Sequence, residues 1–446
     1  MAKLKNYNGH FCESDFEYAF ITFLEKEGWN YLAGNKINRV TKNDVLIADD
    51  FKAFISSTNN DLTDQEVTQV FDNVRLVGAE SDFATLHKVY GWMVDGVQFT
   101  PQNGLPQMVN LIDFENPDNN IFRVVNQFTV EYTNNGQKEN RRPDVLLFVN
   151  GMPLCVIELK NPGDAHATVF NAWEQINIRY WRDIPHLLHY CPLACISDGV
   201  KTRLGTVRTP YEHFYAWRRV NDGDEVSTLP FAETETMIKG VYSPARFLEL
   251  FRDYIYFQDT IYDHEEVEIV CRYPQFFASK LLKQSIVNSI VDGTGKGGTY
   301  FGATGCGKTY TMAFLARQLA LRCTDIPAIG SPTIILIVDR EELQKQGAKL
   351  FTKSKEFLNL GEVSVVKNRK QLREELGARQ SGGFYICTIQ KFCDREDDKI
   401  GLINDRKNII CFSDEAHRTQ LEHSKKIQFS KDADENMKAM VSKPYA

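Results

Sequence analysis

Two carboxylates and a lysine lie close together in the stretch RRPDVLLFVNGMPLCVIELK, residues 141–160. Asp144 begins one apolar run, Asn150-Gly151 marks a turn, and Glu158 and Lys160 end the second run. Because side chains two apart on a strand point the same way, Glu158 and Lys160 share a face. Asp and Glu oxygens that hold Mg²⁺ beside a lysine suit metal-assisted cleavage of a phosphodiester, in which the cation activates a water and the lysine orients it.

The turn decides whether Asp144 reaches Glu158, because cross-strand partners share a face. A two-residue loop at Asn150-Gly151 would pair Asp144 with Ile157. A three-residue loop would pair it with Glu158. The sequence therefore predicts an odd-length loop or a β-bulge, despite the strong Asn-Gly signal for a two-residue turn. The alternative is an ordinary hairpin with solvated charges, but Glu158 and Lys160 interrupt an apolar run, where charges need partners or a ligand.

This stretch looks like the PD-(D/E)xK nuclease core, and RRPDVLLFVNGMPLCVIELKNP in particular resembles the R subunit, the endonuclease and motor subunit, of type I restriction enzymes. The resemblance implies that Asp144 and Glu158 hold Mg²⁺ and that Lys160 takes part in catalysis. In the nuclease family an acidic residue of the first helix approaches the metal. Glu17, in the predicted helix of residues 14–28, is the candidate; the alternative is a capping box in which Ser14 caps this helix.

A second helix is predicted from Asp164 to about Trp181. R subunits carry a Q-x₃-Y signature just after the nuclease lysine, and Gln175 is the candidate for its glutamine. Here the spacing is Q-x₄-Y, because Arg179 occupies the expected tyrosine position. A fifth step along an α-helix turns a side chain away by about 100°. We therefore expect Tyr180 to lie in the core and not in the site.

A second group of residues, GATGCGKT at 302–309, fits the phosphate-binding loop G-x₄-G-K-[ST]. Glycines let backbone N–H groups face phosphate oxygens, Lys308 supplies positive charge and Thr309 binds Mg²⁺. A short strand at 299–301 and a helix at 310–321 are predicted to flank the loop. The residues predicted to bind nucleotide are Gly302, Thr304, Gly305, Cys306, Gly307, Lys308 and Thr309.

Further strands are predicted after this loop. Three buried runs follow: 333–338, 384–389 and 408–413. The last run delivers the sequence DEAH, which starts at Asp414, to its carboxyl end, where ligands bind in open α/β sheets. Asp414 would hold Mg²⁺, and Glu415 would polarise the water that attacks ATP.

This set resembles the first RecA-like lobe of a superfamily 2 helicase, and VDREELQ, TIQKF and DEAHRTQ look like the R subunit. RYPQFFA (272–278) resembles the family segment in which a glutamine reads adenine. Gln275 is the candidate, and a surface glutamine is the alternative. The resemblance thus implies ATP as a cofactor beside Mg²⁺. Nothing here matches the family's second lobe or helical regions, so we expect a fragment with an incomplete motor lobe that binds nucleotide without translocating DNA.

The predicted fold class is α/β, with a PD-(D/E)xK restriction-endonuclease-like domain at 1–243 and a RecA-like parallel-sheet lobe at 244–446. The domain linker is placed in or just after the polar segment 221–243. Strands at 193–197 and near 214–220 would complete the first sheet. Ten cysteines without a C-x-x-C pair predict free thiols and no zinc.

Composition limits the location and the mode of DNA binding. No apolar run approaches the ~20 residues that span a bilayer, and no signal peptide is recognisable, so a cytoplasmic protein is expected. The net charge of −7 excludes a bulk electrostatic grip on nucleic acid. DNA contacts must come from local basic patches, and the candidates are Arg141-Arg142, Lys201-Arg203-Arg208 and Arg218-Arg219.

The leading hypothesis is the DNA-cleaving, ATP-dependent subunit of a type I restriction enzyme. Its implied partners are double-stranded DNA and the methyltransferase (M) and specificity (S) subunits. A RecB-like repair helicase-nuclease is a second hypothesis, although there the nuclease usually follows the motor, and here it precedes it. A non-cutting DNA-remodelling scaffold is the third; it predicts a degenerate metal site, whereas Asp144, Glu158 and Lys160 are all present.

Overall fold

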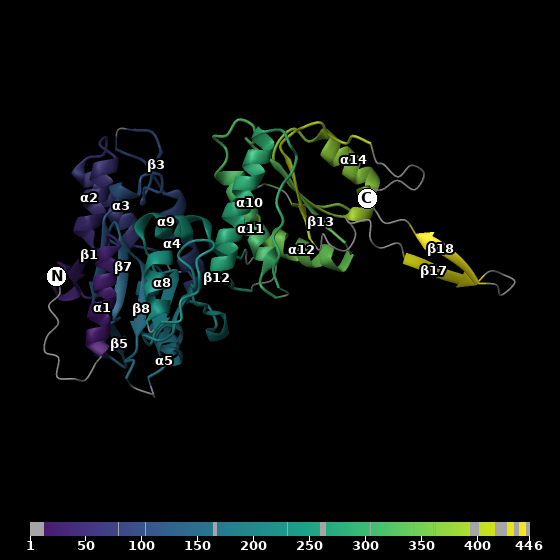
Figure 1. Ribbon diagram of the computed structural model, residues 1–446. Helices are drawn as coiled ribbons and strands as arrows, with labels where there is room; N and C mark the ends of the chain where they lie inside the picture. The colour runs from purple at the N-terminus through teal and green to yellow at the C-terminus, as the bar shows by residue number, and fades with distance from the viewer. Residues whose placement is uncertain are drawn as a thin grey trace. The chain divides into compact units, whose positions relative to one another are not determined.

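The computed structural model describes residues 13–442 with short gaps. The gaps are residues 79, 103, 164–166, 230, 259–264, 304, 340, 360, 362, 393–400, 415–425 and 432–436. Contacts divide the chain into two compact units, Met1–Phe257 with Glu266–Tyr273, and Gln258–Glu265 with Pro274–Ala446 (Figure 1).

The first unit is built on a six-stranded mixed sheet with the order β1-β4-β7-β8-β9-β10. Its strands are β1 (Asn30–Ala33), β4 (Phe122–Asn126), β7 (Val145–Val149), β8 (Met152–Leu159), β9 (Leu193–Ser197) and β10 (Thr202–Thr206). Neighbours are antiparallel except β1 with β4 and β8 with β9. Every residue of β7, β8 and β9 is buried, as in central strands covered on both faces.

Helices surround this sheet, and α1 packs on β1, β4 and β8. The helices are α1 (Glu13–Lys26), α2 (Ala48–Thr58), α3 (Asp64–Arg75), α4 (Asp82–Asp95), α5 (Val169–Glu174), α6 (Trp181–Asp183), α7 (Pro185–Leu188), α8 (Ala232–Val241) and α9 (Pro244–Asp253). The short strands outside the sheet are β2 (Val97–Phe99), β3 (Gln107–Val109), β5 (Val130–Asn134), β6 (Gln137–Arg141), β11 (Ile255–Phe257) and β12 (Glu268–Val270).

Some expectations for this unit are confirmed and others are wrong. The hairpin and the strand at 193–197 form as predicted. The predicted strand near 214–220 does not form; only Tyr215 bridges Leu204, and β10 completes the sheet instead. Phe214 is buried with its ring against Gly205, where a Cβ would lie 2.6 Å from the ring.

The segment expected to hold the linker contains α8, whose Met237 and Ile238 are buried in the first unit. Contacts also group 244–257 with this unit, whereas the predicted boundary lies at 243. The domain ranges 1–243 and 244–446 therefore stay a prediction. Among the described residues, no helix has the length and apolar character needed to cross a bilayer.

The second unit contains a four-stranded, fully parallel sheet with the order β14-β15-β13-β16. Its strands are β13 (Thr333–Val338), β14 (Val363–Val365), β15 (Phe384–Thr388) and β16 (Ile409–Ser413). Its helices are α10 (Tyr273–Val291), α11 (Lys308–Leu321), α12 (Glu341–Lys353), α13 (Lys355–Leu358) and α14 (Arg369–Ala378), and a separate ribbon pairs β17 (Lys426–Lys431) with β18 (Met437–Ser442). The three predicted strands and the helix after the phosphate loop are confirmed.

The strand predicted at 299–301, before the phosphate loop, is wrong. These residues pair with no described strand, and the Phe301 side chain is 95% exposed. Of the described strands, β16 pairs only with β13. Cys411 in β16 is consequently exposed.

Candidate active site

The β7–β8 hairpin has the register that the site needs. Val149 pairs with Met152 across a two-residue turn, and Asn150 and Gly151 have positive φ angles of 50° and 77°. The register shifts between Leu147 and Phe148, so that Val145 pairs with Ile157. The predicted bulge is thus confirmed.

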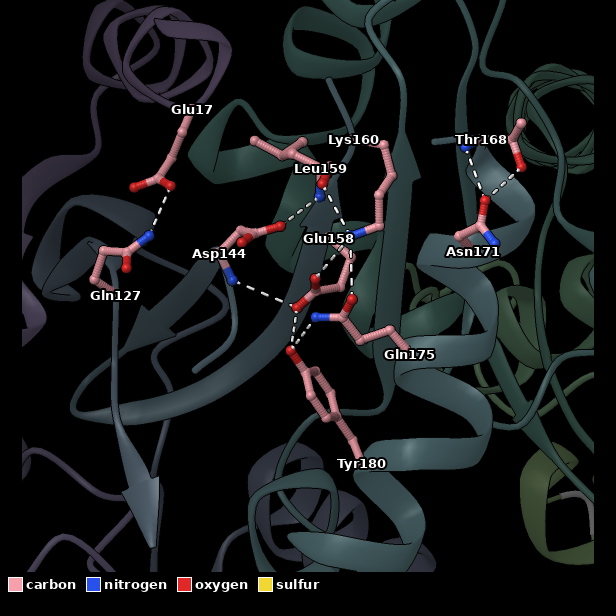
Figure 2. Close-up of polar contacts among 10 residues, drawn as sticks. All are labelled: Glu17, Gln127, Asp144, Glu158, Leu159, Lys160, Thr168, Asn171, Gln175 and Tyr180. Carbon is pink, nitrogen blue, oxygen red and sulfur yellow. Dashed lines mark hydrogen bonds and ion pairs between the residues drawn. The ribbon is translucent and has the colours of Figure 1, made fainter. Parts of the chain in front are cut away.

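Asp144 and Glu158 consequently lie side by side at the end of the hairpin (Figure 2). The Asp144 N–H points to Glu158 Oε1 at 3.4 Å, and the Leu159 N–H donates to Asp144 Oδ2 at 2.8 Å. Glu158 is fully buried and Asp144 is 9% exposed. The two predicted carboxylates are therefore brought together.

Lys160 completes the group, because its Nζ lies 3.7 Å from Glu158 Oε2. The same Nζ donates to the Leu159 carbonyl at 3.2 Å and to Gln175 Oε1 at 3.1 Å. Its side chain is 13% exposed. The structure thus places Gln175, the candidate from the Q-x₃-Y signature, in contact with the lysine.

Tyr180 closes a ring of contacts that the sequence did not predict. Its hydroxyl donates to Glu158 Oε1 at 2.5 Å and accepts from Gln175 Nε2 at 2.8 Å (Figure 2). Tyr180 is buried, as expected, but the expectation that it points away from the site is wrong. Glu158, Lys160, Gln175 and Tyr180 therefore form one closed network.

The local helix geometry explains this correction. Residues Gln175–Tyr180 form a π-helical turn between α5 and α6. A π-turn has i→i+5 hydrogen bonds, so residues i and i+5 lie on the same face of the helix. In an ordinary α-helix, residues i and i+4 share a face. The extra residue of Q-x₄-Y is absorbed in this turn. The helix start predicted at Asp164 lies outside the described residues, and α5 itself is capped by Thr168.

The electrostatics of the pair favour a bound cation. Burial raises the pKa of Glu158 well above its usual range, the neighbouring Asp144 raises it further, and Lys160 opposes this change. Burial also raises the pKa of the Tyr180 phenol, so that the phenol stays a hydrogen-bond donor. Two adjacent carboxylates in a buried place are costly to ionise together without a positive charge.

The donor atoms fit a magnesium ion. Within the described ranges, no three His, Cys, Asp or Glu side chains are placed to hold a metal together. Mg²⁺, however, usually takes one or two carboxylates and completes its shell with water and phosphate oxygens. Glu158 Oε2 is buried without a hydrogen-bond partner, and the Asp144 carboxylate is near enough to raise the pKa of Glu158.

Glu17 approaches this site from α1, but it is not a capping-box residue. Helix α1 already includes Glu13, so Ser14 lies inside its first turn. Glu17 accepts from Asn126 Nδ2 at 2.5 Å and from Gln127 Nε2 at 2.8 Å. Burial raises the pKa of Glu17, the two amides oppose this, and the charge on Asp144 adds to it.

Two further residues near Asp144 escaped the sequence analysis. Burial raises the pKa of Glu13, and Asp144 and Lys160 both influence it, which places Glu13 in the same electrostatic neighbourhood. Gln127 has a φ of 54° and donates its backbone N–H to the Asp144 carbonyl at 3.3 Å. A left-handed, non-glycine residue at this point is the kind of strain that accumulates at functional sites. The position of Glu13 four residues before Glu17 is the one signal that could have revealed it.

Two arginines of the predicted basic patches form ion pairs with carboxylates of the same chain. Arg141 forms an ion pair with Asp183 at 2.7 Å, and Arg208 pairs with Glu266. Arg142, Lys201 and Arg218 are exposed.

In the second unit, the phosphate loop leads into the N-terminus of α11. Gly305 and Gly307 have φ angles of 79° and 83°, which L side chains rarely adopt. Lys308 donates its Nζ to the Gly302 carbonyl at 3.1 Å, and Thr309 lies half-buried in the first turn of α11. Thr304 lies outside the described residues.

Gln275 is not a surface residue, so that alternative is wrong. Its side chain is buried, and its Nε2 donates to the Gly307 carbonyl at 3.0 Å. A Cβ on Gly307 would come within 2.5 Å of this nitrogen, so the loop and the glutamine are closely fitted.

Asp414 stands directly after β16, and its N–H donates to the Ile337 carbonyl of β13 at 2.9 Å. It thus lies at the carboxyl edge of the parallel sheet, as predicted. Glu415 lies outside the described residues.

Two family models match the chain. Residues 11–213 match the model of the type I restriction enzyme R protein N terminus, and residues 274–444 match the SWI2/SNF2 ATPase model. The first match contains the β7–β8 hairpin and the network around Glu158. The second contains the phosphate loop and the parallel sheet.

Curated relatives agree with these matches. The chain is 30% identical over 437 residues to the type I restriction enzyme HindI endonuclease subunit of Haemophilus influenzae, covering 94% of this chain and 40% of that protein. It is 28% identical over 433 residues to a putative type I restriction enzyme endonuclease subunit, MjaIXP, of Methanocaldococcus jannaschii, covering 90% and 39%. A Staphylococcus aureus endonuclease subunit, SauMSSORF170P, is 25% identical over 416 residues, covering 91% and 40%. The chain therefore spans about 40% of the length of these relatives.

Proposed function

Because the chain belongs to the R (endonuclease) subunits of type I restriction enzymes and corresponds to their N-terminal portion, we propose that its first unit cuts double-stranded DNA in a Mg²⁺-dependent reaction. The observation that carries this proposal is the β-bulge, because it sets Asp144 opposite Glu158. Without the shift in register, the two carboxylates would lie on opposite faces of the hairpin.

In this proposal Asp144 and Glu158 hold the cation, and Lys160 faces the attacking water and the scissile phosphate. When bound, Mg²⁺ lowers the pKa of water and neutralises charge on the phosphate. Gln175 and Tyr180 orient Lys160 and Glu158. Gln175 Oε1 accepts a hydrogen bond from Lys160 Nζ, and the Tyr180 hydroxyl donates one to Glu158 Oε1. Oε2 is thereby left as the oxygen for the metal. Glu17 contributes indirectly, because both of its carboxylate oxygens accept hydrogen bonds from the side chains of Asn126 and Gln127.

Substitution of Asp144 tests this function. We expect Asp144→Ala to abolish Mg²⁺-dependent plasmid cleavage by the assembled enzyme while duplex DNA binding is retained. The matched control is Asp82→Ala, which removes an exposed carboxylate from the start of α4. No cleavage by the unmutated assembly would favour the scaffold hypothesis, and full cleavage by the Asp144→Ala assembly would exclude this site.

We propose that the second unit binds ATP and Mg²⁺ and belongs to a motor that moves DNA. The match to an SWI2/SNF2 ATPase supports this, together with a phosphate loop in which Gly305 and Gly307 adopt left-handed backbone. In the proposal Lys308 neutralises phosphate charge, Thr309 and Asp414 hold Mg²⁺, and Glu415 polarises water. Gln275 would read adenine while its amide supports the loop at Gly307.

The whole-protein activity is also part of the proposal. The curated relatives carry the name of restriction endonuclease subunits, and the chain covers about 40% of their length. We propose that this chain works with methyltransferase and specificity subunits on double-stranded DNA. We also assign residues 1–243 to the nuclease domain and 244–446 to the motor lobe.

A further inference from the structure

A two-stranded ribbon precedes the site in the chain. Strands β5 and β6 pair from Val130 with Arg141 to Asn134 with Gln137, outside the six-stranded sheet. The turn at Asn135-Gly136 has φ angles of 48° and 79°. Only Arg142 and Pro143 separate β6 from Asp144. Figure 1 shows β5 in the first unit.

One face of the ribbon is fixed to the helix that carries Gln175 and Tyr180. The Tyr132 hydroxyl donates to Glu139 at 2.5 Å, and the Arg141 guanidinium lies 5.1 Å from the Tyr132 ring centroid. Arg141 also donates to Asp183 at 2.7 Å, and Asp183 is the last residue of α6. This face therefore holds the ribbon in a defined position next to the active site.

The opposite face is open and basic. Glu131, Thr133, Lys138 and Asn140 share it by strand alternation. Lys138 is 84% exposed, and Lys42, 58% exposed, joins the face through an ion pair of 3.4 Å with Glu131.

Charge on this face contrasts with the charge of the chain. Lys42 and Lys138 both pair with the one carboxylate of Glu131, and exposed Arg142 directly follows β6, so that cations outnumber carboxylates here. The whole chain has a net charge of −7. A local surplus of positive charge beside hydroxyl and amide groups suits the sugar and phosphate oxygens of a duplex.

We propose that this outer face binds the sugar-phosphate backbone of double-stranded DNA adjacent to the bond that the active site cuts. The inference rests on the proposed nuclease function and names the element that holds its substrate. Arg142 stands two residues, at most about 7 Å of chain, before Asp144. A phosphate bound at the Arg142 end of the ribbon thus lies close to Asp144, and the contact reads no base sequence.

The test measures binding of a short fluorescent duplex to the full chain, without Mg²⁺, from about 50 to 200 mM salt. Each lost phosphate contact lowers the slope of log affinity against log salt by about 0.9. For the Lys42→Ala/Lys138→Ala protein we expect roughly tenfold weaker binding and a slope smaller by about 2. Glu131→Gln is expected to change binding in the opposite direction, because it removes the carboxylate that competes with DNA phosphates.

The matched control is Lys239→Ala in α8, which removes an exposed lysine that also pairs with a glutamate, Glu235. It is expected to bind like the unmutated chain. Unchanged affinity and slope in the double variant, or an equal loss in Lys239→Ala, would overturn the proposal. Thermal melting of each variant confirms that the fold is intact.

Cleavage kinetics separate this inference from the nuclease function itself. The double variant is expected to raise the KM for DNA with kcat unchanged, whereas Asp144→Ala removes kcat and keeps binding. If the unmutated assembly does not cut DNA, the nuclease proposal fails, and the binding measurement still decides the role of the ribbon.

Discussion

At the scale of single residues, the site depends on how Glu158 is held. Its Oε1 accepts from Tyr180, and its Oε2 lies near Lys160 with no hydrogen bond. Burial and Asp144 both raise the pKa of this carboxyl. The ionised form of Glu158 is thus destabilised when no cation is bound. Metal affinity is therefore expected to depend on the protonation of Glu158.

The sign of this linkage gives a prediction for Glu158→Gln. Between the usual value of 4.5 and the raised pKa of Glu158, the folded metal-free protein holds a proton that the unfolded chain has released. Stability therefore falls as pH rises through this window. We expect Glu158→Gln to reduce the loss of stability with rising pH and to abolish cleavage. At neutral pH its Tm should rise by about 2–4 °C for each kcal/mol gained in the free energy of unfolding. Thermal melts across pH 4–8 in a metal chelator check this. A melting curve with the same pH dependence as that of the unmutated chain would contradict it.

Gln127 offers a second prediction at this scale. Its amide contacts Glu17, and its backbone N–H contacts the Asp144 carbonyl from a left-handed conformation. The Gln127 side chain orients Glu17, a charged neighbour of Asp144, and loss of such an outer partner of a metal site typically costs about 10–100-fold in metal affinity. We expect Gln127→Gly, which keeps the backbone conformation, to raise the half-saturating Mg²⁺ concentration at least about tenfold with little change in Tm.

Calorimetry of Mg²⁺ binding checks this change without relying on cleavage. The exchanged pair Glu17→Gln/Gln127→Glu should recover most of the affinity, since an amide again meets a carboxylate. An unchanged Mg²⁺ affinity in Gln127→Gly would show that Gln127 only ties α1 to the sheet.

At the scale of elements, the π-turn between α5 and α6 is the decisive feature. It lets Gln175 and Tyr180 meet despite one extra residue. Deletion of Arg179 gives Q-x₃-Y, which an ordinary α-helix accommodates on one face. We expect this deletion to keep cleavage within about tenfold of the unmutated assembly.

Insertion of one alanine after Arg179 is the matched control. The helix cannot absorb a second extra residue in the same turn, so Tyr180 loses Glu158, and we expect cleavage to fall at least about tenfold. Plasmid cleavage by the two assemblies is compared at equal DNA occupancy. Equal activity of the insertion and the deletion would show that the Gln175–Tyr180 contact is not needed.

Sequence reasoning recovered the elements whose pattern is local. Apolar runs identified β8, β9, β13, β15 and β16, and the need to pair Asp144 with Glu158 predicted the bulge. It failed at 214–220, where only Tyr215 bridges Leu204, and at 299–301, where no described strand offers a partner, because a local pattern does not contain the tertiary contacts on which strand pairing depends. Tyr180 was misplaced because the α-helical period was assumed. Gln127 was missed because no sequence signal announces a left-handed glutamine.

At the scale of the whole molecule, the two compact units each contain one of the two predicted sets of ligand-binding residues. The first match ends at residue 213 and the second begins at 274. Nucleotide binding and metal binding at the nuclease site should therefore be separable by mutation.

Lys308→Ala tests this separation. Loss of a charge-assisted contact with phosphate costs about 1.5–3 kcal/mol, or roughly 10–100-fold in ATP affinity. We expect this loss in Lys308→Ala, with unchanged Mg²⁺ affinity at Asp144 and Glu158. Asp144→Ala should show the reverse pattern. Binding of a fluorescent ATP analogue and Mg²⁺ calorimetry measure both sites, and loss of both in either variant would contradict independence.

The most direct measurement is the position of a metal in crystals of this chain grown with Mn²⁺ in place of Mg²⁺, read from its anomalous scattering. We expect a peak at the end of the hairpin, about 2.0–2.2 Å from an Asp144 oxygen and from Glu158 Oε2. Lys160 should then be separated from Glu158 Oε2. A peak bound only by Glu13 or Glu17, or none beside a Glu158 still paired with Lys160, would contradict it.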